Sequence, residues 1–368
     1  MKIIYVANVR MPTEKAHGVQ IAKTCESFLD AGQEVELVVP NRYTAIQESI
    51  EEYYHLHRTI PVRRLAVVDS VSWGKIGFLL EIFSFAIAAA RYARTQPEGI
   101  VYGRDEIVLL CVSFFTRHRV VWESHTGSWN LFARMLSSRL HRLVVISHGL
   151  EQLYQDHGVP RKKIIVAPDA VEFTEPNESK GEARTRLGLP LAATIALYIG
   201  RIDMWKGVDV LCAAAERVAP IQVVIIGGED MQIRDAKKKY PLVTFLGPRP
   251  YAEIFDNQQA GDVLVLPNTG RDVISSRYTS PLKLFTYMTS GIPVVTSDLP
   301  SLREVLDDTS AYWFKADDAD DLARAIKEAL SDPQADEKAR IAKDLVKRYT
   351  WEARARSILA RLEQVLSA

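Results

Sequence analysis

The sequence is poor in cysteine, has no excess of charge and lacks a long uninterrupted apolar run. Its three cysteines, Cys25, Cys111 and Cys212, lie far apart and form neither a CxxC pair nor a cluster with histidines. This argues against structural zinc or a disulfide framework and indicates a reducing, cytoplasmic compartment. The 46 basic and 46 acidic residues give a formal net charge of +0, so no global field attracts nucleic acid. We expect no nucleic-acid partner, and any anion site must be local.

The longest apolar run starts at Ile76, IGFLLEIFSFAIAAARYA, and is interrupted by Glu81. It is too short and too charged for a membrane span, and a buried helix is favoured over a membrane-surface helix. The stretch 73–95 nevertheless combines Trp73, an apolar face and basic flanks. This pattern raises the hypothesis of peripheral contact with the cytosolic membrane face. The start, MKIIYVANVRMP, lacks the apolar region and cleavage site of a signal peptide.

The 368 residues, 47% hydrophobic and 25% charged, fit two globular domains. The segments KIIYVA, GVQIAKTCESFLDAG and QEVELVVP read as strand, helix and strand. Such a unit predicts a parallel sheet with helices on its faces. GIVYG, HRVVWES and RLVVISH are further short β-branched runs. The first half is therefore predicted to be one doubly wound domain.

The apolar periodicity stops over residues 172–188, EFTEPNESKGEARTRLG, and then restarts. This segment predicts an exposed connection with a short helix. ATIALYIG, IQVVIIGG, LVTFLG, DVLVLP and IPVVTS follow as strands of a second doubly wound domain. We predict an N-terminal Rossmann-like domain over 1–172 and a C-terminal one over 173–345. The amphipathic segment 346–368 is predicted to form a helix that packs back towards the N-terminal domain.

One loop after a predicted strand reads GRIDMWKG. In open α/β sheets, ligands bind beyond the carboxyl ends of the strands, where helix N-termini present free N–H groups. Gly200 permits a sharp exit from the strand, and Arg201 and Lys206 supply a guanidinium fork and an ammonium group. This pair suits two adjacent phosphates, although an ordinary solvated loop fits the same residues.

Two further loops follow strands. IIGGED places Gly227 and Gly228 directly after a strand, where backbone can approach a ligand closely. FLGPRPYAEIF ends a strand at Gly247, starts a helix near Tyr251 and contributes Arg249 as a candidate contact. Each of these loops, taken alone, fits an ordinary turn equally well.

The stretch YTSPLKLFTYMTSGIPVV predicts a loop, a helix and a buried strand. Ser280 is the expected N-cap, and Pro281 the first helical residue. Lys283 then lies in the first turn, where a cation is unfavourable unless an anion is bound. The alternative is a lysine that points to water.

Several motifs in order carry a resemblance to a known family: AHGVQ, ISHGLEQLY, GRIDMWKG, IIGG, VTFLG, SPLKLFTYMTSGIPVV and DLPSLREVL. Together they resemble the family-four retaining glycosyltransferases of the GT-B fold, over nearly the whole chain. The resemblance implies an α/β protein with two doubly wound Rossmann-like domains that face a central cleft. It implies transfer of a sugar from a nucleotide diphosphate sugar to a hydroxyl acceptor with retention, in polysaccharide or glycolipid assembly, without a metal or another cofactor.

The resemblance also implies roles for residues. Arg201 and Lys206 would neutralise the donor diphosphate, and His125 of WESHTG would face the sugar or orient the acceptor, unless it is a structural histidine. The first loop, with His17, would fold over the donor phosphate as a flap. The expected donor-binding residues are Gly18, Gly200, Gly227, Gly228, Arg249, Tyr278, Ser280, Pro281, Leu282, Lys283 and Thr286.

This sequence departs from the family at the two glutamates of its signature, which are replaced by Tyr278 and Thr286. A threonine hydroxyl accepts one hydrogen bond but cannot grip two ribose hydroxyls as a carboxylate does. Asp272 is a candidate substitute acid. Two alternatives therefore stay open: a non-catalytic nucleotide-sugar-binding partner, and a GT-B-like sugar nucleotide 2-epimerase. A dinucleotide dehydrogenase is disfavoured, because no GxGxxG follows the first strand. The acceptor is expected to be a carbohydrate or a lipid-linked sugar.

Overall fold

The computed structural model describes residues 1–203 and 206–363. The chain forms two compact units: residues 1–168 with 351–368, and residues 169–350. These bounds lie a few residues from the predicted divisions. The helix at the C-terminal end belongs to the first unit, because its apolar residues share that unit's core.

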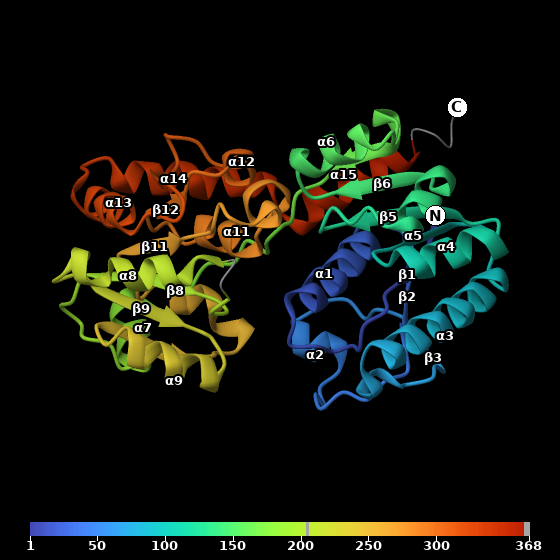
Figure 1. Ribbon diagram of the computed structural model, residues 1–368, viewed down its shortest axis with the longest axis horizontal. Helices are drawn as coiled ribbons and strands as arrows, with labels where there is room; N and C mark the ends of the chain where they lie inside the picture. The colour runs from blue at the N-terminus through green and yellow to red at the C-terminus, as the bar shows by residue number, and fades with distance from the viewer. Residues whose placement is uncertain (204–205, 364–368) are drawn as a thin grey trace. The chain divides into compact units, whose positions relative to one another are not determined.

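The described part of unit 1 contains a sheet of seven parallel strands in the order β3-β2-β1-β4-β5-β6-β7 (Figure 1). Sequence reasoning missed the two edge strands, β3 and β7. The strands are β1 Lys2–Val6, β2 Glu34–Pro40, β3 Val62–Leu65, β4 Ile100–Gly103, β5 Arg119–Ser124, β6 Arg142–Val145 and β7 Ile164–Val166.

Helices cover both faces of this sheet. One face shares a core with α1, α2 and α15, in which Cys25, Phe28, Ile358 and Leu359 pack against strand residues such as Tyr5. α3, α4 and α5 pack side by side outside that core and cover the other face. The helices are α1 Ala16–Asp30, α2 Ile50–Tyr54, α3 Gly74–Arg94, α4 Glu106–Phe115, α5 Leu131–Arg139, α6 His148–Asp156 and α15 Trp351–Glu363.

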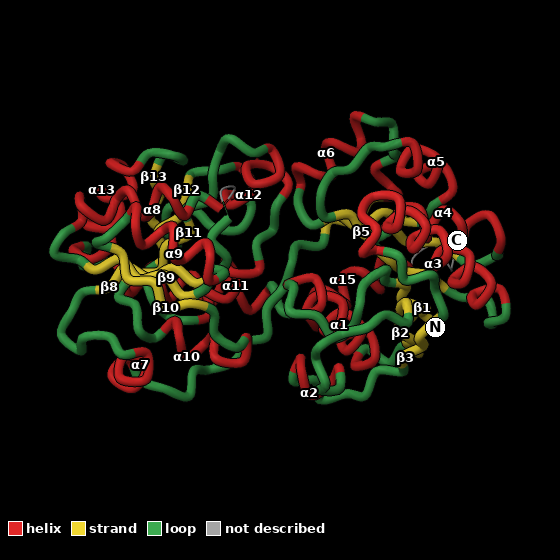
Figure 2. The backbone as a smooth tube through the Cα atoms, turned by 60° about the horizontal axis from the view of Figure 1, so that its bottom comes forward, coloured by secondary structure: helices red, strands yellow, loops and turns green. Residues whose placement is uncertain are grey.

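The described part of unit 2 contains a sheet of six parallel strands in the order β10-β9-β8-β11-β12-β13 (Figure 2). Its edge strand β13 was also missed from the sequence. The strands are β8 Ile195–Ile199, β9 Gln222–Ile226, β10 Val243–Gly247, β11 Val263–Leu266, β12 Val294–Ser297 and β13 Tyr312–Phe314.

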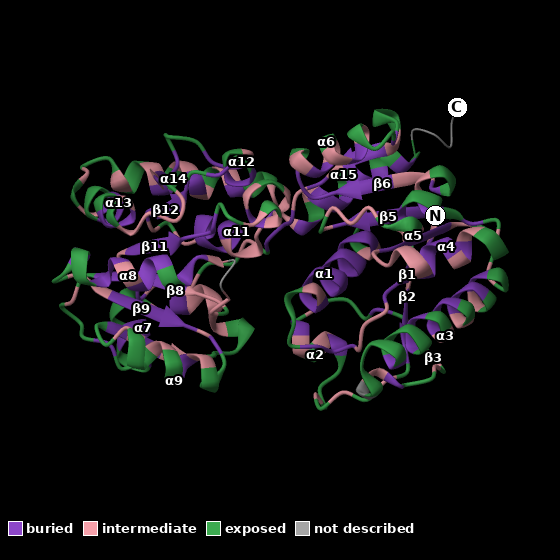
Figure 3. Ribbon diagram, in the orientation of Figure 1, coloured by how far each residue is buried: buried purple, intermediate pink, exposed green. Residues whose placement is uncertain are grey.

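Two apolar cores lie on the two faces of the unit 2 sheet. One includes residues of α8 and α13, and the other includes residues of α7, α11 and α12. Figure 3 shows most strands of each unit as largely buried; the edge strand β3 is exposed or half-buried. The helices are α7 Lys180–Leu187, α8 Val208–Val218, α9 Asp230–Lys239, α10 Ile254–Gln258, α11 Leu282–Thr289, α12 Pro300–Arg303, α13 Ala319–Ser331 and α14 Ala335–Leu345.

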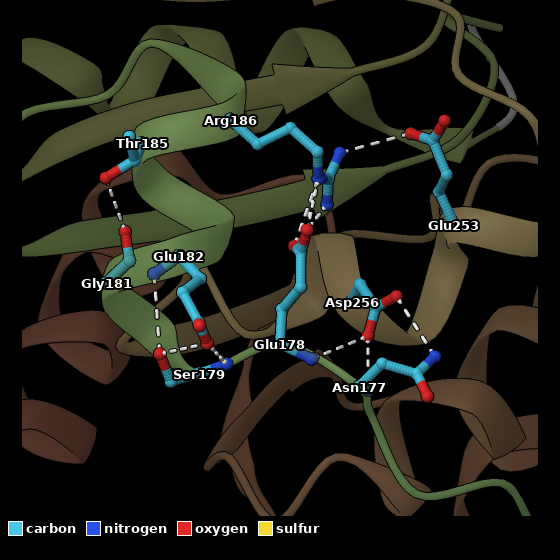
Figure 4. A network of polar contacts seen from close by, with 9 residues as sticks. All are labelled: Asn177, Glu178, Ser179, Gly181, Glu182, Thr185, Arg186, Glu253 and Asp256. Carbon is cyan, nitrogen blue, oxygen red and sulfur yellow. Dashed lines mark hydrogen bonds and ion pairs between the residues drawn. The ribbon is translucent and has the colours of Figure 1, made fainter.

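The predicted connection over 172–188 is fixed to unit 2 by polar contacts (Figure 4). Ser179 and Glu182 form a capping box at the start of α7. Arg186 binds Glu178 at 2.7 Å and Glu253 at 3.1 Å. The segment is therefore an ordered part of unit 2, with the short helix that the sequence predicted.

Each sheet has a point at which the strand order reverses. In unit 1 the reversal lies between β1 and β4, and in unit 2 it lies between β8 and β11. Chain segments that leave neighbouring strands there turn to opposite faces of the sheet, so a crevice opens at the carboxyl ends. These two positions are where ligand-binding groups are expected.

Candidate functional site

Three cationic side chains gather at the carboxyl end of β8 in unit 2. Arg201 and Lys206 both approach Asp203, at 3.4 and 3.5 Å. Lys283 in the first turn of α11 donates to the Tyr198 hydroxyl at 2.5 Å and lies 4.0 Å from the centre of that ring. Segments far apart in sequence thus meet at the switch point of the sheet.

The electrostatics of this cluster favour an added anion. Burial lowers the pKa of Lys283 well below its ordinary value, Lys206 lowers it further, and Asp203 offsets part of the effect. The pKa of Lys206 is also lowered, mainly by burial. Three cations around one carboxylate leave an excess of positive charge. The first turn of α11 adds backbone N–H groups and the positive end of a helix dipole.

Glycines let these groups approach one another. A Cβ on Gly200 would lie 2.5 Å from Lys283 Nζ, and a Cβ on Gly227 would lie 2.2 Å from the Gly200 carbonyl oxygen. A Cβ on Gly207 would lie 1.7 Å from the carbonyl oxygen of Pro267, so the start of α8 rests against the segment that leaves β11. The ends of β8, β9 and β11 converge for this reason.

Two tyrosines fix the end of β8. Tyr198 donates its hydroxyl to the Arg201 carbonyl at 2.9 Å, and Tyr287 of α11 accepts the Ile199 N–H at 2.7 Å. Both rings are fully buried. The cationic loop is therefore held by the core beneath it.

The start of α11 differs from the prediction. The helix begins at Leu282 with Pro281 at the cap position and no side-chain cap. The Ser280 hydroxyl instead accepts the Asp169 N–H at 2.9 Å. The predicted N-cap role of Ser280 is wrong, because its buried side chain serves the segment at the beginning of unit 2.

The two positions that lack the family acids are occupied differently. Thr286 is 2% exposed and donates to the Lys283 carbonyl at 2.9 Å, so only its oxygen lone pairs are left for a ligand. Tyr278 is half-buried in a π-helical turn, Ile274–Tyr278. Asp272, the candidate substitute acid, caps that turn by accepting the N–H groups of Ile274 and Ser275.

Unit 1 has a cavity of about 340 Å³ at the carboxyl ends of β1, β4 and β5, which is also its switch point. Its lining is polar and titratable on several sides. The lining residues are Ala7, Asn8, Val9, His17, Gln20, Ile21, Arg104, Asp105, Glu106, Trp122, Glu123, Ser124, His125 and Thr126.

A buried carboxylate, Glu123, organises this cavity. Its Oε1 lies 2.6 Å from His125 Nε2 and 2.8 Å from Arg104 Nη2. Its Oε2 lies 3.2 Å from Arg354 Nη2 of α15 and accepts the Tyr102 hydroxyl. Glu123 therefore fixes the histidine ring and one arginine through the same oxygen.

The charges in the cavity are set by these contacts. Burial alone would raise the pKa of Glu123, but Arg354, Arg104 and His125 outweigh burial and hold that pKa well below its ordinary value. For His17, burial together with the Arg104 charge lowers the pKa to about 4. At neutral pH the cavity thus contains an ionised Glu123 and a neutral His17.

Known proteins resemble this chain in sequence and in fold. Residues 193–332, most of unit 2, match the family described as Glycosyl transferases group 1. The D-inositol 3-phosphate glycosyltransferase of Corynebacterium urealyticum is 28% identical over 235 residues, covering 57% of this chain and 52% of the relative. The putative teichuronic acid biosynthesis glycosyltransferase TuaC of Bacillus subtilis is 25% identical over 201 residues, 54% of this chain and 49% of that protein. These matches span about half the length of the curated relatives.

Solved structures match the whole chain. Sucrose-phosphate synthase from Thermosynechococcus elongatus superposes with a TM-score of 0.79 at 19% identity, covering 100% of both chains. Anabaena HepE, solved in complex with UDP-glucose, gives a TM-score of 0.77 at 16% identity and covers 99% of this chain and 100% of that one. The chain resembles the GT-B glycosyltransferases. The expected fold class, two doubly wound Rossmann-like domains, is confirmed.

The structure shows where several of the expected donor-binding residues lie. Gly227 and Gly228 follow β9 directly, as predicted, while Leu282 is half-buried and Arg249 exposed. His125 lines the unit 1 cavity. Their roles in binding a donor stay predictions.

The sequence predicts that the first helix begins at Gly18, whereas α1 begins at Ala16, so His17 and Gly18 both lie in its first turn. The expected approach of Gly18 to a donor phosphate stays a prediction. A Cβ on Gly18 would lie 2.1 Å from the Tyr54 hydroxyl oxygen, so this glycine is required for close packing between α1 and α2. His17 lines the cavity from the helix.

Sequence reasoning on the GT-B motifs missed the residues that hold the charged ones. Tyr198 and Asp203 position the cations of unit 2, and Arg104 and Arg354 neutralise Glu123 in unit 1. Asp203 lies in the quoted GRIDMWKG loop, three residues before Lys206. This spacing could have predicted their ion pair. Arg354 gave no such signal, because it lies in the helix at the far end of the chain. Within the described ranges, no group of three or more His, Cys, Asp or Glu side chains is arranged to hold a metal.

Proposed function

We propose that this protein transfers a sugar from a nucleotide diphosphate sugar to a hydroxyl acceptor, with retention at the anomeric carbon, in polysaccharide or glycolipid assembly. The observation that carries the proposal is the cluster of Arg201, Lys206 and Lys283 at the switch point of unit 2. Burial, and to a smaller extent repulsion from the neighbouring cations, lowers the pKa values of Lys206 and Lys283. A diphosphate would relieve that repulsion, since it supplies adjacent negative charges to all three groups.

The proposed chemistry follows from where charge develops. The bond between the anomeric carbon and the diphosphate oxygen breaks, and the acceptor oxygen bonds to the same face of the sugar. The acceptor proton passes to an oxygen of the departing diphosphate. Arg201, Lys206 and Lys283 stabilise the leaving group electrostatically, so we propose that the reaction proceeds without a metal ion.

His125 is proposed to bind a hydroxyl of the sugar or of the acceptor. Glu123 fixes the orientation of its ring through the contact at Nε2. A histidine held in this way can bind a hydroxyl in one orientation without rearranging. The cavity in which it lies is lined by polar groups that suit sugar hydroxyls.

A second candidate function rests on Thr286 and Tyr278. Without carboxylates at these positions, the donor ribose loses a charged acceptor, which costs about 1 to 3 kcal/mol when nothing replaces it. A protein with this site could bind a nucleotide sugar without turning it over. The non-catalytic reading predicts binding with no release of nucleotide diphosphate.

The test is a panel of UDP-, GDP-, ADP- and dTDP-sugars followed by NMR, with carbohydrate and lipid-linked acceptors. UDP-sugars come first, because the similar HepE was solved with UDP-glucose. We expect release of one nucleotide diphosphate and a product with the anomeric configuration of the donor, unchanged by EDTA. Lys206→Ala should lower the rate at least about 100-fold, whereas Lys237→Ala, at an exposed site on α9, should not.

Two results would count against the proposal. Binding without turnover across the panel would favour the non-catalytic function, and Thr286→Glu would then be expected to tighten nucleotide binding by restoring the acid. Turnover of the sugar nucleotide to its epimer with no acceptor would favour the 2-epimerase alternative.

A further inference from the structure

Helix α3 carries an apolar stripe that no other described part of unit 1 covers. Ile76, Leu80, Phe83 and Ile87 recur at helical spacing on one side, and Trp73 precedes the helix. Their exposed fractions lie between 44% and 73%. Figure 3 shows exposed segments along α3 beside its buried side. The interpretation of this stretch as a buried helix is therefore wrong for this side.

The apolar surface continues onto α5. Phe83 packs against Phe132 with ring centres 6.4 Å apart, and Leu131 and Met135 beside it are 66% and 41% exposed. Two helices thus present one surface, which we call the docking face. Its residues are Trp73, Ile76, Leu79, Leu80, Phe83, Ile87, Leu131 and Met135.

Segments 70–97, 107–122 and 124–150 of unit 1, which include α3, α5 and α4 after Glu106, are rich in basic residues, although the whole chain has a net charge of +0. Residues 107–122 and 124–150 contain no Asp or Glu, and residues 70–97 contain only Glu81. Glu81 is fully buried and accepts from Asn8 at 3.2 Å. The basic residues of these segments are Lys75, Arg91, Arg94, Arg117, Arg119, Arg134, Arg139 and Arg142.

Cations border the apolar residues directly. Lys75, Arg91 and Arg134 are exposed, and among the described residues none of them forms an ion pair with a carboxylate. Arg91 follows Ile87 by one helical turn. Long basic side chains at the border of an apolar surface can place their stems beside lipid and their charges among headgroups.

α3 is suited to lie on a bilayer rather than to cross it. It is the one helix in the described ranges that is long and apolar enough to span, but 44% of its apolar window is buried inside the unit. Ala86, Ala89, Ala90 and Ala93 pack inward, and Glu81 is bonded to the segment after β1. Leaving the unit would expose this core, so only the outward side is available to lipid.

We propose that unit 1 docks on the surface of an anionic lipid bilayer through the docking face. The apolar side chains enter the interfacial layer, and Lys75, Arg91 and Arg134 bind acidic headgroups. An anionic bilayer fits this face best, because its acidic headgroups complement the basic side chains. A neutral apolar partner would leave these cations without counter-charges. The inference does not depend on the proposed transferase activity.

The experiment is flotation of the full chain with vesicles of phosphatidylcholine, with and without phosphatidylglycerol. We expect the protein to float with the anionic vesicles and to be released by salt. Lys75→Glu combined with Arg134→Glu should weaken anionic binding about 10-fold or more, as should Ile76→Ser combined with Leu80→Ser. Matched controls in unit 2 are Lys237→Glu with Lys238→Glu, and Leu191→Ser with Leu242→Ser, all at exposed sites.

A second readout follows insertion directly. Trp73 is 71% exposed, so its emission should shift to the blue on anionic vesicles, and Trp73→Phe should remove that shift. Failure of the native protein to float, or equal effects of docking-face and control variants, would overturn the proposal. So would self-association that Ile76→Ser with Leu80→Ser abolishes, since a second copy would then cover the face. Release of nucleotide diphosphate measured without lipid reports the transferase proposal separately.

Discussion

At the scale of single residues, Glu123 is expected to matter first for the folding of unit 1. Two arginines and a histidine surround this fully buried carboxylate. Glu123→Gln would leave those cations without their counter-charge, and removal of one partner from such a group costs about 3 to 5 kcal/mol. Hydrogen exchange of unit 1 should show this loss. The control is Glu352→Gln, which removes the carboxylate of an exposed ion pair with Arg356 on α15. It should change the free energy of unfolding by about 0.5 kcal/mol at most. An equal loss of stability in both variants would contradict the role of Glu123.

His17 gives a prediction for pH. Its pKa is lowered from 6.5 to about 4 by burial and by Arg104, so the unfolded chain binds a proton more readily than the folded chain between these values. Its contribution to stability is therefore complete above pH 6.5 and is lost as the pH falls towards 4. Thermal melts over this range should show a flatter pH dependence for His17→Gln. His141 has a pKa lowered to about 4 for similar reasons, and His141→Gln should remove a separate part of the slope.

At the scale of elements, Gly207 is expected to set the approach of α8 to β11. Gly207 and Gly188 share a left-handed conformation, with φ of 64° and 68°, so Ala at either costs about 1 to 2 kcal/mol in backbone strain. Only at Gly207 would the new Cβ meet the Pro267 carbonyl, at 1.7 Å; at Gly188 nothing lies within 4 Å. Gly207→Ala should thus cost about 1 to 3 kcal/mol more than Gly188→Ala in denaturant unfolding. Similar values would show that the loop relaxes freely.

The elements also show what the sequence could predict. The ten strands read as β-branched runs all form, whereas β3, β7 and β13 were missed, and each of these lies at the edge of its sheet. An edge strand pairs on one side only and can be short and polar, as VRRL in β3 is. Its strand character comes from its neighbour, so the local pattern carries little signal.

The part of the candidate site that lies in loops after strands could be predicted from the sequence. Arg201, Lys206 and Lys283 were found from their positions after Gly200 and in a helical first turn, and the structure brings them together. The supporting Tyr198 looked like a core residue in a strand. For α3 the sequence favoured a buried helix and kept its apolar face only as a hypothesis of membrane contact, because hydropathy measures how apolar a segment is but not whether the fold covers it.

At the scale of the whole molecule, unit 1 is built from two segments that lie far apart in sequence. The helix α15 adds Ala355, Ile358, Leu359 and Leu362 to the core beneath α1, and Arg354 to the charges around Glu123. A chain that ends at Thr350 loses both contributions. It should expose apolar surface on α1 and leave Glu123 with a smaller counter-charge.

This truncation is expected to act on one unit only. Hydrogen exchange should accelerate in α1, β1 and β5, while β8 and β11 keep their protection, because residues 169–350 contain both apolar cores of unit 2. A chain that ends at Glu363 retains α15 and serves as the control. If Arg354→Met in the full chain accelerates exchange nearly as much as the truncation, the charge on Glu123 dominates. If it does not, the apolar contacts of α15 with α1 hold unit 1 together, and loss of protection in both units would contradict the division of the chain.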